Sequence, residues 1–375
     1  MSFGEFLGNT ATVTRLRESV AAGRVPQSMI LAGPRGAGKY TLALMLARAV
    51  NCTGGGGGGY AETDGLPDFC GRCRNCVRIG EAAKLEERVA EAVDAREEMR
   101  EADKKDTRIV VQTHPDVMVI PPDPPQLLIK LGQVRQVIHA AYYRPPVEAR
   151  RAFFLFTSAA FMKEAANSLL KVLEEPPAYA TLILLAENPQ ELLPTIRSRA
   201  ITHRLGALPA AELEALLAAR RPELKPAERA LVARLAEGAV GRALGFDLDV
   251  WLKSRQDALI LLRTALGTSR GEPDYSTLFR ATETYRAGAE GQEKTMNLLR
   301  ALGSLFEDLL LAHAGTPHLA RNIDLAGELG QMAQAVSVDW LDGAAHALAA
   351  VQSGMRRNLL RPLSLDAMAL GLGER

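Results

Sequence analysis

All four cysteines of the chain lie in one short stretch, and their thiols are the most distinctive chemical groups in the sequence. Cys52, Cys70, Cys73 and Cys76 have the spacing C-x17-C-x2-C-x2-C. Four thiolates can close a tetrahedral zinc shell, and the x2 spacing lets one turn present successive sulfurs to one ion. A shell closed by four protein ligands is structural, with no open position for catalysis. An iron–sulfur cluster and scattered free thiols are the alternatives.

A glycine-rich turn is the second candidate site. Residues 33–41 read Gly-Pro-Arg-Gly-Ala-Gly-Lys-Tyr-Thr, against the phosphate-loop pattern G-x-x-x-x-G-K-[ST]. The glycines, Gly33, Gly36 and Gly38, let backbone N–H groups curl around a phosphate, and Lys39 would reach its outer oxygens. A glycine turn without a ligand is the alternative. The sequence leaves open whether this loop binds ATP.

The metal half of such a site departs from the pattern. Tyr40 stands where a small hydroxyl should hold Mg²⁺, and Thr41 is one residue late, rotated by about 100° around the helix. The strand expected to carry an acidic pair at its tip ends in Phe156-Thr157-Ser158 instead. Without carboxylates there is no Mg²⁺ ligand and no base for water, so we expect no ATP hydrolysis by this chain.

Apolar patterning indicates an α/β half followed by a helical half. Strand patterns at 29–32, 108–120, 152–156 and 181–186 alternate with helical patterns at 10–23, 39–47, 130–141 and 163–175. This alternation is typical of a parallel sheet covered on both faces. After residue 205 only helical periodicity follows. The stripe of Leu302, Leu305, Phe306, Leu309 and Leu310 packs either against a neighbouring chain or inside its own domain.

Composition excludes some classes of protein. The net charge of +1 over 375 residues gives no overall attraction to nucleic acid, so any DNA contact must be local or shared. Apolar runs are shorter than a membrane span and Met1–Asn9 lacks a signal-peptide pattern, so we expect a cytoplasmic protein with reduced cysteines. Gly54–Gly59 is typical of a flexible linker, and the charged residues 80–106 predict a solvated helical insertion.

Several longer motifs resemble the clamp-loader subunits of the bacterial DNA polymerase III holoenzyme. They are Glu164-Ala-Ala-Asn-Ser-Leu-Leu-Lys-Val-Leu-Glu-Glu-Pro-Pro177, Thr195-Ile-Arg-Ser-Arg-Ala200, Phe3-Gly-Glu-Phe-Leu-Gly-Asn9 and Gly23-Arg-Val-Pro26. Together with the glycine loop and the cysteines, the resemblance covers residues 3–245. The helical remainder matches at Arg357-Asn358-Leu359-Leu360 and Leu365-Asp366. The resemblance implies an AAA+ module, structural Zn²⁺ on the four cysteines, and a His-Pro-Asp turn at His114 rather than a fifth zinc ligand.

Within that family the sequence is similar to the delta-prime kind, which commonly has a degraded ATPase site. The resemblance implies that Arg199, in the position of the Ser-Arg-Cys arginine, is an arginine finger for a neighbouring subunit's ATP. Ala200 replaces the family's cysteine. Arg242 is similar to the family's second sensor arginine, although an ordinary arginine at a helix end fits it equally well. A surface salt bridge is the alternative role of Arg199.

The family implies three domains and a set of partners. The AAA+ α/β domain would span 1–205, with a zinc module at about 51–80 and the insertion at about 80–106. A helical lid at 206–248 and a helical collar at 249–375 would follow. The implied partners are gamma/tau and delta subunits, the sliding clamp and primed DNA, with no membrane.

Rival hypotheses remain at this point. An active gamma/tau-type ATPase would need Thr41 and a displaced acid such as Glu164 to rebuild the metal site. A zinc-containing DNA-binding adaptor with a vestigial AAA+ fold would bind DNA directly, with a steep salt dependence. A standalone AAA+ regulator is the third alternative.

Overall fold

The computed structural model describes residues 2–55, 60–124, 126–143, 146–267, 275–285, 289–355 and 361–373. Two compact units divide the chain. The first contains residues 1–208 and 239–242, and the second contains residues 209–238 and 243–375. The break after Leu208 falls three residues beyond the expected end of the α/β domain. The division of the remainder into a lid and a collar stays a prediction, and the weak match at 357–360 lies outside the described residues.

A six-stranded sheet forms the centre of the first unit, in the order β4-β5-β6-β7-β1-β8. Its strands are β1 (Ser28–Ala32), β4 (Val111–His114), β5 (Val117–Ile120), β6 (Ala152–Phe156), β7 (Ala180–Ala186) and β8 (Ile201–Arg204). All neighbouring strands are parallel except β4 and β5. The parallel sheet and its apolar strands confirm the sequence prediction, whereas the edge strand β8 was not predicted.

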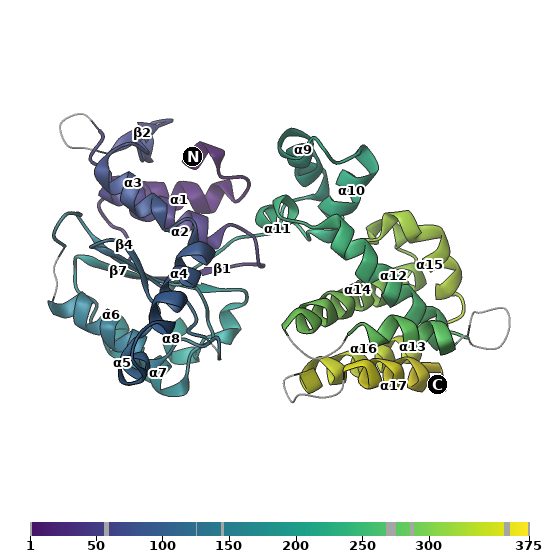
Figure 1. The fold of residues 1–375 in the computed structure, drawn as a ribbon. Helices are drawn as coiled ribbons and strands as arrows, with labels where there is room; N and C mark the ends of the chain where they lie inside the picture. Colours follow the sequence, from purple (N-terminus) through teal and green to yellow (C-terminus); the bar gives the residue numbers. More distant parts are fainter. Residues whose placement is uncertain are drawn as a thin grey trace. The chain divides into compact units, whose positions relative to one another are not determined.

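Helices cover both faces of this sheet, as Figure 1 shows. On one face lie α1 (Thr10–Ala21), α2 (Lys39–Asn51) and α3 (Arg74–Glu81), packed on a core that includes Met29 and Leu31. On the other lie α6 (Leu131–Tyr143) and α7 (Lys163–Glu174), packed on a core that includes Ile30 and Ala32. Successive residues of β1 thus serve opposite cores, because side chains alternate along a strand.

The segment between α2 and β4 contains more structure than its sequence suggested. A short antiparallel hairpin, β2 (Ala61–Thr63) and β3 (Leu66–Asp68), precedes α3. Arg17 on α1 holds the hairpin by donating to the carbonyls of Thr63, Leu66 and Pro67, the last at 3.0 Å. Of the glycine run 54–59, residues 56–59 lie outside the described residues.

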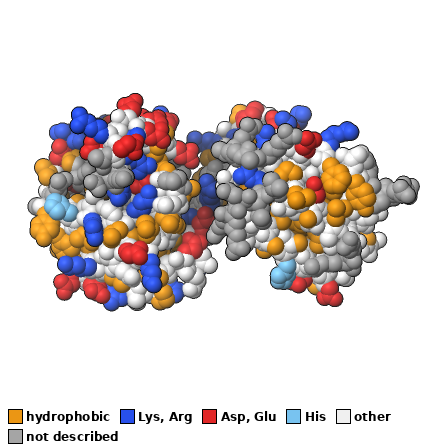
Figure 2. All heavy atoms as spheres, turned by 60° about the horizontal axis from the view of Figure 1, so that its bottom comes forward, with side chains coloured by type: hydrophobic (Ala, Val, Ile, Leu, Met, Phe, Trp, Pro, Cys, Tyr) orange, Lys and Arg blue, Asp and Glu red, His pale blue; other side chains and the backbone are white. Residues whose placement is uncertain are grey.

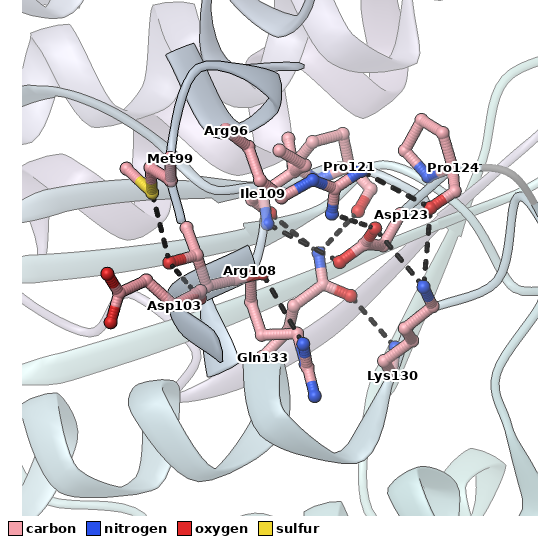
Figure 3. A network of polar contacts seen from close by, with 11 residues as sticks. Arg96, Met99, Asp103, Arg108, Ile109, Pro121, Asp123, Pro124, Lys130 and Gln133 are labelled. Atoms are coloured by element: carbon pink, nitrogen blue, oxygen red, sulfur yellow. Dashed lines mark hydrogen bonds and ion pairs between the residues drawn. The ribbon is translucent and has the colours of Figure 1, made fainter. Parts of the chain in front are cut away.

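The charged insertion forms two helices, α4 (Leu85–Glu97) and α5 (Glu101–Asp106). Most of its charged side chains are exposed, as predicted, but the other side of α4 packs on the domain. Leu85 and Val89 pack against the core of the α2 face. Arg96 reaches the buried carboxylate of Asp123, at the centre of the network drawn in Figure 3. The expectation of a simply solvated helix is therefore wrong for the inner face of α4.

The second unit contains helices and no strand among its described residues. Its helices are α9 (Ala210–Arg220), α10 (Pro226–Leu235), α12 (Leu248–Ala265), α13 (Tyr275–Glu283), α14 (Ala289–His313), α15 (Ala326–Ala333), α16 (Val338–Met355) and α17 (Arg361–Gly373), with α11 (Val240–Leu244) shared between the units. Of the predicted stripe on α14, Leu302, Leu305, Phe306 and Leu309 are buried inside this unit, whereas Leu310 is 46% exposed. The stripe therefore builds the core of its own domain.

Charged side chains of both signs are interspersed on the face of the chain shown in Figure 2, in line with the net charge of +1. Within the described ranges, no helix combines the length and the hydropathy needed to cross a membrane.

Candidate phosphate loop and cysteine cluster

The glycine loop lies between the end of β1 and the start of α2, as predicted. Gly36 and Gly38 adopt φ values of +83° and +85°, which favour glycine. A Cβ on Gly36 would lie 2.7 Å from the backbone nitrogen of Arg242, and one on Gly38 would lie 2.9 Å from the Phe6 ring. The backbone N–H of Gly241 donates to the carbonyl of Gly36 at 2.8 Å. The segment 239–242, which carries the candidate second sensor Arg242, thus docks directly on the loop.

A cavity of about 890 Å³ opens beside this loop. Lys39, Tyr40 and Thr41 line it from α2, and Thr157 and Ser158 line it from the tip of β6. Its charged lining is mixed, with Arg35, Lys39 and Lys84 against Glu86, Glu87, Glu187 and Glu191. A polyphosphate without a metal ion would therefore meet more carboxylates than cations here.

Lys39 turns toward its own loop. Its ammonium group donates to the carbonyls of Gly33, at 2.6 Å, and Pro34, at 2.9 Å. Burial lowers the pKa of Lys39, while the charges of Glu187 and Glu191 oppose that shift. Lys39 therefore donates its hydrogen bonds to carbonyls of its own loop. A bound phosphate would have to replace these carbonyls as the acceptor.

Tyr40 has a structural partner away from the loop. Its hydroxyl donates to the carbonyl of Ala82, the residue that caps α3, at 2.6 Å. The ring packs against the core of the α2 face, and burial raises the pKa of the phenol. The side chain that replaces the expected metal-holding hydroxyl therefore connects α2 to the cysteine module.

The tip of β6 offers hydroxyl groups and no carboxylate. Thr157 continues the strand by donating its N–H to the carbonyl of Ile120 at 3.1 Å. Glu164 lies in the first turn of α7, is exposed, and is not among the described residues that line the cavity. The acids at the cavity come instead from the segment after β7 and from the start of α4. No sequence pattern indicated that residues 84–87 would reach the loop, since only the fold brings them there.

The four cysteines meet in one cluster. Their sulfur atoms all lie within 4.8 Å of one another. A tetrahedral zinc site with bonds of about 2.3 Å places its sulfurs about 3.8 Å apart, so the cluster fits this ion after a small contraction. A Cβ on Gly54 would overlap the sulfur of Cys70, which explains a glycine at this position.

Backbone groups already favour thiolates in this cluster. The N–H of Cys70 donates to the Cys52 sulfur, and the N–H of Cys73 donates to the Cys70 sulfur, both at 3.3 Å. Burial opposes ionisation of Cys73, but hydrogen bonds from Thr53 and Cys76 outweigh it and lower its pKa to about 6, whereas burial and the hydrogen bond with Cys73 raise the pKa of Cys76. These donors are what a thiolate ligand requires, so the residues present suit a metal ion.

His114 is part of a turn and not a ligand of this cluster. Its Nδ1 accepts the backbone N–H of Asp116 at 3.1 Å, and its Nε2 lies 3.2 Å from Asn75 Oδ1. Asn75 in turn donates to the carbonyl of Asn51 at 2.9 Å. The Asp116 carboxylate accepts three backbone N–H groups of residues 147–149. This network ties the cysteine module to the sheet.

Arg199 lies just beyond the short helix α8 (Pro194–Arg197). Its guanidinium donates to Glu174 Oε1 at 2.7 Å and to the carbonyl of Thr195 at 3.0 Å. The two charged side chains are 34% and 51% exposed. The surface salt bridge that the sequence left as an alternative is therefore present, and both of its members come from the family-like motifs.

Comparison with known proteins places the chain in a family. Residues 8–209, more than half of the chain, match the family described as "DNA polymerase III, delta subunit". The chain is 30% identical over 218 residues to DNA polymerase III subunit gamma/tau of Mycobacterium bovis, covering 58% of this chain and 31% of that protein. It is 31% identical over 228 residues to subunit delta' of Escherichia coli, covering 60% and 63%.

The chain thus spans about a third of the length of the gamma/tau relatives that it matches. Among solved structures it resembles a DNA polymerase III, gamma subunit-related protein from Thermotoga maritima, at 16% identity and a TM-score of 0.35, covering 97% of this chain and 99% of that one. From the match to the family over residues 8–209, we conclude that the chain belongs to the bacterial DNA polymerase III clamp-loader family.

Proposed function

We propose that this chain is a delta-prime-type clamp-loader subunit that binds its partners without hydrolysing ATP. The proposal rests on the side chains that occupy the two positions expected to hold Mg²⁺. Tyr40 directs its hydroxyl to the Ala82 carbonyl, and the tip of β6 supplies Thr157 and Ser158 to the cavity. A phosphoryl-transfer site needs a small hydroxyl and a carboxylate at these two places to hold Mg²⁺.

Arg199 would act in a neighbouring subunit's site. A guanidinium placed at a γ-phosphate stabilises the charge that develops in the transition state. In the isolated chain Arg199 is paired with Glu174, and both side chains are partly exposed. An exposed pair contributes only about 0–1 kcal/mol, so a stronger anion on a partner can displace Glu174.

The four cysteines would hold Zn²⁺ as a structural ion. The ion would join the end of α2, the turn before α3 and α3 itself, since Cys52 caps α2 and Cys73 caps α3. Four protein ligands leave no open position for chemistry. The metal would therefore contribute folding free energy and keep Ala82 in reach of Tyr40.

The partners would be gamma/tau and delta subunits, the sliding clamp and primed DNA. Relatives named gamma/tau and delta' support this, as does the position of Arg199 on the surface of the α/β unit. In this proposal the chain is a fixed reference in the assembly, and ATP-driven neighbours move against it to open the clamp. The lid at 206–248 and the collar at 249–375 would connect it to them.

The test is DNA-stimulated ATP turnover by the reconstituted clamp loader with Arg199→Ala in this chain. We expect a loss of turnover of about 10³-fold at the site that Arg199 completes, with assembly unchanged by size-exclusion chromatography. Arg220→Ala is the matched control, because Arg220 is an exposed arginine at the end of α9. Turnover equal to that of the control would remove the arginine-finger role.

An active gamma/tau-type ATPase is the second candidate, supported by relatives of that name with similar identity. It requires Thr41 and one of the acids at the cavity to hold Mg²⁺. Magnesium-dependent ATP turnover by the isolated chain, abolished by Lys39→Ala, would establish it. We expect turnover at the level of the Lys39→Ala variant.

A further inference from the structure

A second cavity, of about 450 Å³, lies at the outer edge of the sheet in the first unit. It is formed by α1, by the segment around α8 and by the edge strand β8. None of its lining residues belongs to the cavity at the glycine loop. The residues that line it are Thr12, Arg15, Pro189, Gln190, Arg197, Thr202, His203 and Arg204.

The charge of this cavity is of one sign. Three arginines and a histidine line it, and no aspartate or glutamate is among the described residues that do so. The side chains of Arg15 and Arg204 are exposed and make no hydrogen bond or ion pair with other described residues. Like charges gathered without a counter-charge raise the free energy of the folded chain, and a bound anion would remove that cost.

Two nitrogen atoms at this cavity lack partners. Arg197 Nε and His203 Nε2 are buried and make no hydrogen bond with the described residues. Arg197 is held in place by its other nitrogen, Nη1, which donates to Gln190 Oε1 at 2.7 Å. Buried polar groups without partners are rare in native proteins and often mark a missing ligand or water.

We propose that this pocket binds a backbone phosphate of a nucleic-acid strand. Arginine side chains and hydroxyl groups such as that of Thr202 donate hydrogen bonds to phosphate oxygens in protein–nucleic acid complexes, whereas the Thr12 hydroxyl already donates to the carbonyl of Arg204 at 3.2 Å. The exposed arginines lie on α1 and on β8, so successive phosphates can follow the open edge of the sheet. This inference rests on the proposed function in taking DNA as a partner and deepens it by assigning a contact site, and it does not depend on which subunit type the chain is.

The lining favours a strand backbone over a free nucleotide. No Phe, Tyr or Trp ring lines the pocket within the described part of the chain; the imidazole of His203, whose Nε2 is buried, is its one aromatic ring, and Pro189 is its one non-polar residue. A nucleotide or an exposed base is usually held by stacking on aromatic or apolar side chains, whereas backbone contacts need only positive and neutral donors. The cavity at the glycine loop differs, because four carboxylates line it.

The test uses the isolated full chain and a fluorescein-labelled 20-base-pair DNA duplex, followed by anisotropy at several NaCl concentrations. We expect Arg15→Gln and Arg204→Gln each to weaken binding about fivefold, and each to lower the salt slope by about one. Both arginines are exposed, so we expect the far-UV circular dichroism of the variants to be unchanged. Arg220→Gln removes the same charge from the second unit and should leave affinity within about twofold of the unmodified chain.

Competition by inorganic phosphate and by ATP distinguishes a site for the backbone of a nucleic-acid strand from a site for a free anion. If the pocket binds a strand backbone, an unlabelled duplex should displace the labelled duplex at a concentration at least about a hundredfold lower than phosphate or ATP, because several phosphates of the duplex bind together. Equal potency of phosphate or ATP would overturn the assignment to a strand. Affinities of Arg15→Gln and Arg204→Gln equal to that of Arg220→Gln would overturn the site itself.

Discussion

Replacing Arg96 with methionine should destabilise the α/β unit by about 3 kcal/mol. Arg96 Nη1 lies 2.7 Å from Asp123 Oδ1, and the side chain of Asp123 is fully buried while that of Arg96 is 15% exposed. Removing one partner of a buried ion pair costs about 3–5 kcal/mol, because the other charge is left unpaired. Lys130 Nζ, 3.3 Å from the same oxygen, retains part of the compensation and places the cost at the lower end.

The same reasoning predicts partial rescue by a second substitution. If the unpaired charge causes the loss, adding Asp123→Asn to Arg96→Met should recover about 1 kcal/mol or more. Asparagine keeps an oxygen for the backbone N–H of Ile109, which lies 3.4 Å from Asp123 Oδ2. As Figure 3 shows, the backbone N–H of Ile109 and the side chains of Arg96 and Lys130 all point to the carboxylate of Asp123.

Urea unfolding followed by two probes is the assay. Both tryptophans, Trp251 and Trp340, belong to the second unit, so their fluorescence reports that unit while far-UV circular dichroism reports both. The circular dichroism midpoint of Arg96→Met should fall by about 1 M urea. Arg88→Met on the same helix is the control, because Arg88 pairs with the exposed Glu91 and should cost under about 1 kcal/mol. A loss for Arg96→Met no larger than for Arg88→Met would refute the reasoning.

Three further predictions concern other sites. Tyr40→Phe should lower the free energy of unfolding by about 1–2 kcal/mol in the same assay, because the Ala82 carbonyl loses its donor at 2.6 Å. Cys73→Ser should reduce bound zinc, measured by mass spectrometry, from about one ion per chain to under half, and chelators should lower the melting temperature of the unmodified chain alone. Burial raises the pKa of Asp257, which accepts the Tyr285 hydroxyl at 2.6 Å. The folded unit therefore favours the protonated acid, and its stability should fall as pH rises above about 4, whereas Asp257→Asn should flatten that dependence in tryptophan fluorescence. An unchanged pH slope in Asp257→Asn would contradict this assignment.

Local patterns predicted what local interactions determine. The strand before the glycine loop, the helix after it and the meeting of the four cysteines all follow from spacing and periodicity over a few residues. The strand β8 was missed because most of its side chains are exposed, so Ile201–Arg204 carries no apolar alternation. Its pairing with β1 through backbone groups is what makes it a strand.

Contacts between distant residues explain what the sequence could not reveal. Arg96 looks like one more charge of a solvated helix until the fold places Asp123, 27 positions later, beside it. The salt bridge between Arg199 and Glu174 likewise joins two motifs, 164–177 and 195–200, whose residue patterns give no sign of a contact between them. The cationic pocket at the sheet edge collects residues from positions 12–15 and 189–204, and periodicity gives no sign that they meet.

The hydrogen bond from Tyr40 to Ala82 also limits how this chain can evolve. A single mutation that restored a small hydroxyl at position 40 would remove the ring from its core contacts and leave the Ala82 carbonyl without its donor. The variant would lose stability at once and would still lack a carboxylate at the tip of β6. Because Tyr40 joins α2 to α3, a return to the phosphate-loop pattern at this position alone would lower the stability of the α/β unit.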